Sequence, residues 1–145
     1  MNDIQGKQVI NGREGELWID GVKVAECTKC RASITFEAND IDISKHFMKD
    51  KKLDGASSDG ELTLHKVTSM MTKKLDEYYR NRKMPSFTII SKLDDPDSLG
   101  AERVALYNCF INELILADWE VGKTGEESYK FTFTDYELLD TINNS

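Results

Sequence analysis

The chain has 145 residues, of which 39% are hydrophobic and 31% are charged. This size and balance suit one folded domain and exclude both a disordered chain and one dominated by membrane-spanning segments. Acidic residues outnumber Lys and Arg by 26 to 19, and the net charge of −7 disfavours a surface that grips nucleic-acid phosphates.

The first residues, MNDIQG, include an acid and no apolar stretch. A secretory signal needs such a stretch, so we expect the protein to stay in the cytoplasm where it is made, with no membrane anchoring. Three cysteines, an odd number, do not make a disulfide framework. The fold must therefore rest on its hydrophobic core.

A β-hairpin is predicted over residues 16–24, where Asp20-Gly21 separates two alternating runs. Asp-Gly supplies the positive φ values that a two-residue type I′ turn requires. Closing the turn there places Trp18 opposite Lys23 on one face. The same register places four aliphatic side chains on the other face: Leu17, Ile19, Val22 and Val24.

The motif formed by Cys27 and Cys30 follows this hairpin and has three readings: a redox couple, half of a zinc site, or two strand residues. A redox C-x-x-C normally begins a helix, and zinc needs two further ligands. The alternation of residues 31–37 instead indicates a strand, in which positions three apart point to opposite faces. We therefore expect one thiol to face inward, one to face outward, and no site.

Residues 40–60 are predicted to form a long loop or arm, because β alternation begins at residue 41, fades, and gives way to turn residues. Loops of this length in compact domains are usually functional or disordered. This one is too apolar for a linker, so we expect it to dock on another subunit. Its apolar contact candidates are Ile41, Ile43, Phe47, Met48 and Leu53.

Basic residues are mixed into the same arm and are its second set of contact candidates. They lie among Asp50 and Asp54 and lack interleaved stacking aromatics, which favours pairing with acids of a neighbour over contact with phosphates. The lysines concerned are Lys45, Lys49, Lys51 and Lys52.

The rest of the chain predicts one helix among strands. Strand patterns occupy residues 61–67, 86–91, 102–111 and 129–134, and an acidic turn lies at 94–97. The apolar stretch at 114–119 is expected to pair with the last strand through a short turn at 122–125. Residues 68–82 have helical spacing, with Pro85 beyond the end. About seven antiparallel strands and one flanking α-helix indicate a mainly β domain, a β-sandwich or barrel, spanning residues 1–145.

Residues for chemistry are sparse. His46 and His65 are isolated, and no nucleophile, P-loop or dinucleotide-binding pattern occurs. The aspartates of the arm do not have the spacing of a calcium loop. We expect no enzyme, no cofactor and no bound metal.

Four segments, in this order, resemble the tail tube protein of contractile-tailed phages, and most closely the type of the PBSX defective prophage and phage-tail-like bacteriocins such as diffocins. They are GREGELWIDGVKVAECTKCRASITFE, KDKKLDGASSDGELTLHKV, TSMMTKKLDEYYRNRK and YKFTFTDYELLD. The resemblance covers essentially the whole chain and is strongest from residue 12 to residue 21.

The resemblance implies a subunit that forms hexameric rings, whose sheets join into an inner barrel and whose stacking makes a tube for DNA or ions. It implies sheath, tape-measure and baseplate proteins as partners, assembly in the host bacterial cytoplasm, and a final place in a particle tail. An acidic lumen would let DNA slide without sticking. The arm would then reach an adjacent subunit.

Two other classes compete with this interpretation. One is the tube of a type VI-like secretion or other contractile injection system, which shares the fold and symmetry. The other is a small β-barrel binding module or enzyme, which would stay monomeric at high concentration.

Overall fold

The computed structural model describes residues 15–94 and 100–141. Most of the acidic turn at 94–97 and the beginning of the chain lie outside these residues. The described part contains eight strands and one helix. The strands are β1 (Gly15–Ile19), β2 (Val22–Lys23), β3 (Cys27–Ile41), β4 (Asp50–His65), β5 (Phe87–Asp94), β6 (Ala101–Ile111), β7 (Glu126–Thr132) and β8 (Asp135–Asp140); the helix is α2 (Met70–Arg80).

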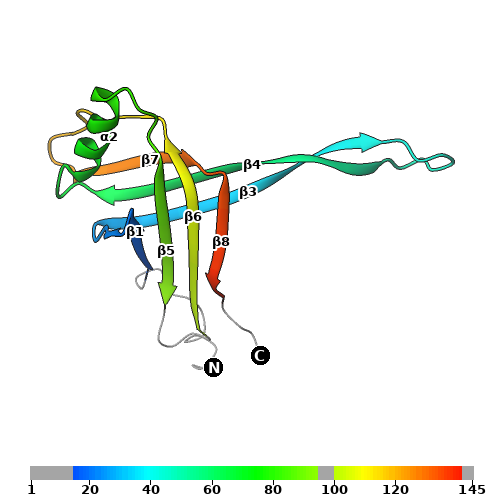
Figure 1. The fold of residues 1–145 in the computed structure, drawn as a ribbon, viewed down its shortest axis with the longest axis horizontal. Coiled ribbons are helices and arrows are strands. Elements are labelled where there is room, and N and C mark those ends of the chain that lie inside the picture. Colours follow the sequence, from blue (N-terminus) through cyan, green and yellow to red (C-terminus); the bar gives the residue numbers. More distant parts are fainter. Residues whose placement is uncertain (1–14, 95–99, 142–145) are drawn as a thin grey trace.

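The strands form an antiparallel sheet that folds into two layers. Its order is β2-β1-β5-β6-β7-β4-β3, with β8 pairing β6 from the side. Strands β5, β6 and β8 run across the direction of β3, β4 and β7 (Figure 1). The mainly β class and the antiparallel pairing are confirmed, as is a single helix within the described residues. These residues form eight strands where about seven were expected, because β8 carries no clear alternation.

Strand β6 belongs to both layers and bends at Asn108. Its first part pairs β8 and its last two residues pair β7. A register shift against β5 and a φ of 55° at Asn108 mark a β-bulge at the bend. The side chain fixes the bulge: Ser86 Oγ donates to Asn108 Oδ1 at 2.8 Å, and Asn108 Nδ2 donates to Thr134 Oγ1 at 3.2 Å.

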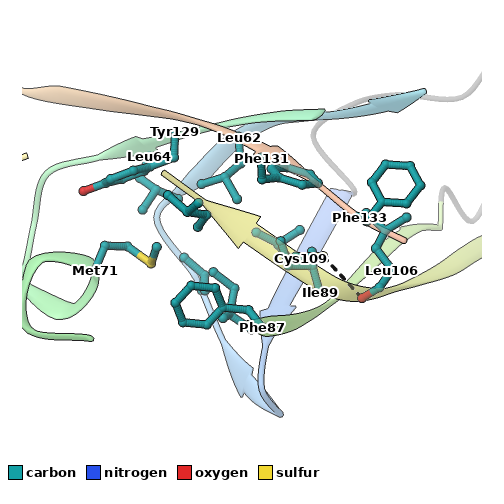
Figure 2. Close-up of a cluster of buried hydrophobic side chains, with 14 of the residues drawn as sticks. Leu62, Leu64, Met71, Phe87, Ile89, Leu106, Cys109, Tyr129, Phe131 and Phe133 are labelled. Atoms are coloured by element: carbon teal, nitrogen blue, oxygen red, sulfur yellow. Dashed lines mark hydrogen bonds between the residues drawn. The ribbon is translucent and has the colours of Figure 1, made fainter. Parts of the chain in front are cut away.

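The hydrophobic core lies between the two layers and under the helix (Figure 2). Met71 and Leu75 are the buried face of α2, and the Tyr78 ring meets the Phe87 ring edge-on at 5.3 Å. The largest fully buried side chains are Tyr129, Phe87, Phe131, Leu17, Ile19, Leu62, Ile89 and Ile111. The helical stripe of α2 and the alternating residues of β7 thus bury the faces that their spacing predicts.

The first hairpin has the predicted register, with Trp18 opposite Lys23 and Ile19 opposite Val22. Its aliphatic face is only partly as predicted. Three members are buried, but Val22 is 53% exposed because β2 is the short outermost strand of its layer.

Two further expectations need correction. Residues 50–60 are not loop: they belong to β4 and pair with β3 as far as Ile41 opposite Asp50, so only 42–49 connect the strands. The apolar stretch 114–119 forms no strand. Both errors arise because alternation is weak where a strand has no body to pack against, and because apolar content alone does not define a strand.

Candidate assembly surfaces

The longest feature of the fold is a two-stranded arm, defined here as residues 36–56. Strand β4 pairs β7 from Gly60 to His65 and β3 from Asp50 to Leu64, so before Gly60 its only partner among the described strands is β3. Ser58, opposite Ile34, makes the last tie to the body: its hydroxyl donates to Phe133 O at 2.6 Å and accepts from Phe133 N at 2.8 Å. Past this point the arm projects away from the two layers (Figure 1).

The predicted contact residues gather at the far end of this arm. Ile41 ends β3, the connection carries Ile43, Phe47, Met48 and Lys49, and β4 carries Lys51, Lys52 and Leu53. Phe47 is 104% exposed, and Met48 and Leu53 are also exposed. Fully burying a side chain such as Phe is favourable by about 1.5–3 kcal/mol, so this end is costly to leave in water.

Electrostatically, the arm end is basic. Residues 41–53, called the arm tip below, contain four lysines and two aspartates, which gives 4 − 2 = +2 in a chain of −7. Two lysines are tied within the arm: Lys51 Nζ lies 2.6 Å from Asp40 Oδ1 and Lys49 Nζ lies 3.8 Å from Asp42 Oδ1. Exposed pairs of this kind contribute about 0–1 kcal/mol and remain available to exchange partners.

A second exposed apolar surface lies beside α2, and sequence reasoning missed it. A hollow of about 230 Å³ is lined chiefly by Leu75, Tyr79, Pro85, Phe110, Glu113 and Leu114. The segment that continues from it is anchored through Leu114 and Ile115, and Thr72 Oγ1 donates to Ile115 O at 3.2 Å. Beyond this anchor, Trp119 is 79% exposed, and Leu116 and Val121 are exposed too.

The two layers leave an open cleft between β3 and β8. It measures about 430 Å³ and is lined by side chains of both layers, including Ile34, Val104, Leu106, Phe133, Tyr136 and Leu138. Among the strands of residues 15–94 and 100–141, β3 ends the order of its layer and β8 pairs only β6. Each therefore presents an edge to which another strand can be added.

The cysteine pair departs from the sequence prediction. A register shift between Cys27 and Lys29 inserts Thr28 as an extra residue, so Cys27 lies opposite Leu64 and Cys30 opposite Leu62. Both leucines are buried, and both cysteines pack against the same core, so the expected inward and outward pair is wrong. The bulge cancels the face change that three residues of flat strand would give.

These thiols are poor nucleophiles. Burial raises the pKa of Cys27, raises that of Cys30 to about 11, and raises that of Cys109 to about 12. Each thiol is therefore protonated at neutral pH, and all three are free.

One carboxylate, Glu127, is buried under the helix end of the body. Its Oε1 lies 3.0 Å from Lys66 Nζ, and its Oε2 accepts the hydroxyl of Tyr129. Burial first, and this hydrogen bond second, raise the pKa of Tyr129. Both oxygens of the carboxylate thus have partners. This arrangement is typical of a structural ion pair rather than of a catalytic acid.

Within residues 15–94 and 100–141, no group of three or more His, Cys, Asp or Glu side chains is placed to hold a metal ion. His46 lies at the arm tip and His65 ends β4. No helix in the described part of the chain is long and apolar enough to cross a bilayer.

A folded two-layer β-sheet with a projecting arm, an apolar arm tip and open strand edges is the architecture of a structural protein that assembles with other subunits. The family described as phage tail tube protein matches residues 2–140. The phage-like element PBSX protein XkdM of Bacillus subtilis (strain 168) is 29% identical over 144 residues, 98% of this chain and 98% of XkdM. The chain therefore belongs to the phage tail tube protein family, and its role is structural, in a tail tube.

Solved structures share the fold at low sequence identity. A chain of the PVC extracellular contractile injection system, from its sheath-tube complex in the extended state, matches with a TM-score of 0.69 at 9% identity, covering 96% of this chain and 99% of that one. A chain of the 6-fold symmetrised anti-feeding prophage baseplate matches with a TM-score of 0.63 at 12% identity, covering 86% and 90%.

Proposed function

We propose that the protein forms hexameric rings that stack into a hollow tube, with the arm of each subunit crossing to a neighbour. The observation that carries this proposal is the arm itself, which leaves the body as a paired hairpin and ends in the fully exposed Phe47. An isolated two-stranded hairpin is marginally stable in water, so an arm of this length needs a partner surface. The 6-fold baseplate relative of the same fold supports the choice of ring.

In this proposal the edges of β3 and β8 join neighbouring subunits into a continuous inner barrel. Edge strands expose unpaired backbone groups, and a closed ring removes such edges. Neighbouring subunits of the ring then contact each other head to tail, through a heterologous interface whose repetition closes the ring.

The bore carries DNA or ions, and the subunit has no catalytic activity of its own. The net charge of −7 supports passage rather than binding, because an acidic wall repels phosphates. Sheath, tape-measure and baseplate proteins are its partners. Assembly takes place in the host bacterial cytoplasm, and the product is the tail of a phage or phage-like particle.

A second candidate is the tube of a contractile injection system that delivers protein instead of DNA. The fold likeness to the PVC sheath-tube complex favours it. Nuclease-protected DNA in purified particles would support the phage tail, and protein cargo without DNA would support the injection system.

The arm is tested by a truncation that keeps the hairpin. Residues 38–54 are replaced by Asn-Gly, which joins Glu37 to Gly55, a directly opposed pair, through a two-residue turn. We expect unchanged thermal unfolding of the subunit and no tubes in negative-stain images. The matched control replaces only Val22, which is exposed on β2, with Thr and should assemble normally. Normal tubes from the truncated chain would contradict the proposal.

A further inference from the structure

The hollow beside α2 combines a cavity with an unpartnered apolar rim. The C-terminal half of the helix contributes Tyr79 and the chain after β6 contributes Leu114, and Met84 and Trp119 are exposed on the two flanking segments. Apolar side chains held around a hollow of this kind are typical of a surface that receives an anchor from another chain.

One side of this surface, the 112–121 segment, has a charge opposite to that of the arm tip. Residues 112–121 contain Glu113, Asp118 and Glu120 and no Lys or Arg, which gives −3 against the +2 of the arm tip. The two sides of the hollow differ in charge: Lys83 lines the helix side, where Arg80 and Arg82 lie over the Tyr79 ring, whereas Glu113 lines the side formed by the 112–121 segment. Opposite charges around an apolar centre fix the orientation of docking.

A subunit does not fill its own hollow with its own arm tip. The arm tip and α2 lie at opposite ends of the molecule (Figure 1). The pairing of β3 with β4 continues to Ile41 opposite Asp50, which holds the arm extended. The occupant must come from a second copy, in a head-to-tail contact of the kind that closes into rings or continues as a tube.

We propose that the hollow beside α2 binds the arm tip of a second copy, with Phe47 inserted among Tyr79, Pro85 and Leu114 and the arm lysines facing the 112–121 acids. This inference rests on the proposed function and adds to it the surface that receives the arm.

The direct test is photo-crosslinking in assembled tubes. A benzoylphenylalanine replaces Phe47, tubes are irradiated, and crosslinked peptides are identified by mass spectrometry. We expect crosslinks between copies from position 47 to residues 75–85 or 110–121. The same photoreactive residue at Leu138, which is exposed on β8 opposite Val104, should give none to these peptides.

Crosslinks from position 47 to another part of the subunit, or to another particle protein, in normal tubes would overturn the inference and leave the proposed function standing. If the unmodified chain forms no tubes at all, the proposed function fails and the inference fails with it.

Charge exchange is an independent test that needs no photoreactive residue. Lys45 and Lys52 make no ion pair within the described part of the arm, and neither Glu113 nor Asp118 makes one among residues 100–141 or 15–94. We expect K45E/K52E and E113K/D118K each to lower tube yield at least tenfold and the combined variant to restore it. Folded subunits of the combined variant, verified by circular dichroism, that still give no tubes would contradict the pairing.

Discussion

Gly60 shows how one residue determines the packing between two strands, β4 and β7. It lies opposite Phe131, and a Cβ built at this position would meet the ring of that phenylalanine. The ring therefore covers the glycine directly, and both belong to the point where the arm leaves the body. Neither residue type nor spacing reveals this contact in the sequence, because it depends on the register between two strands far apart in the chain.

Replacing Gly60 with Ala is expected to destabilise the subunit by about 1–3 kcal/mol, since an added methyl forces a tightly packed aromatic ring to move. Urea unfolding followed by tryptophan fluorescence measures the change. Gly55→Ala is the matched control: its Cβ would meet only Glu37 Oε2, at 3.9 Å, so stability should change by less than about 1 kcal/mol. Equal effects at the two positions would show that the ring contact is not responsible.

The Cys27 and Cys30 pair is a residue-scale case in which the sequence prediction was half right. The assignment to a strand is confirmed, since both positions lie in β3. Their predicted orientation is wrong, because nothing in the residues around Thr28 signals a bulge there. A bulge depends on the partner strand as well as on its own sequence.

At the scale of elements, the corner of β6 connects the two layers. The strand leaves β8 and joins β7 within a few residues, and Asn108 in the left-handed region makes this possible. Asparagine tolerates such a φ better than most residues. Its amide also links Ser86, before β5, to Thr134, between β7 and β8.

Two substitutions of Asn108 separate backbone strain from hydrogen bonding. Asn108→Gly keeps a permissive backbone but loses both side-chain bonds, so we expect a loss of about 0.5–2 kcal/mol in unfolding free energy. Asn108→Ala adds the cost of a left-handed alanine, about 1 kcal/mol more. Chemical denaturation of both variants gives the comparison, and an alanine variant at least as stable as the glycine variant would remove strain from the explanation.

For the arm, the sequence predicts a contact with another subunit, which stays a prediction, but it does not predict the pairing of β3 with β4. Its apolar and basic residues identified 40–60 as exceptional, but their weak alternation suggested a loop. Strands alternate visibly when one face is buried, and the arm has no buried face beyond Ser58. The surface beside α2 was missed for the converse reason: an apolar stretch such as 114–119 is expected in the core, and only the tertiary anchor at Leu114 and Ile115 shows which side chains remain outside.

For the whole molecule, the same chain carries a stable core and three incomplete surfaces: the arm tip, the hollow beside α2, and the edges of β3 and β8. The core followed from local patterns, namely the Asp20-Gly21 turn, the helical stripe of Met71 and Leu75, and the alternation of β7. The folding of the sheet into two layers could not be predicted from these local patterns, because strand order depends on long-range pairing. The proposed function assigns these three surfaces to contacts between subunits, which accounts for their exposure in one copy.

The central claim, that these surfaces close a ring and stack it into a hollow tube, is tested most directly by electron microscopy of the purified full chain at high concentration. We expect long tubes with an open bore, and six subunits per ring in the reconstruction. A sample that remains monomeric under all assembly conditions, with its sheath and baseplate partners present, would contradict it.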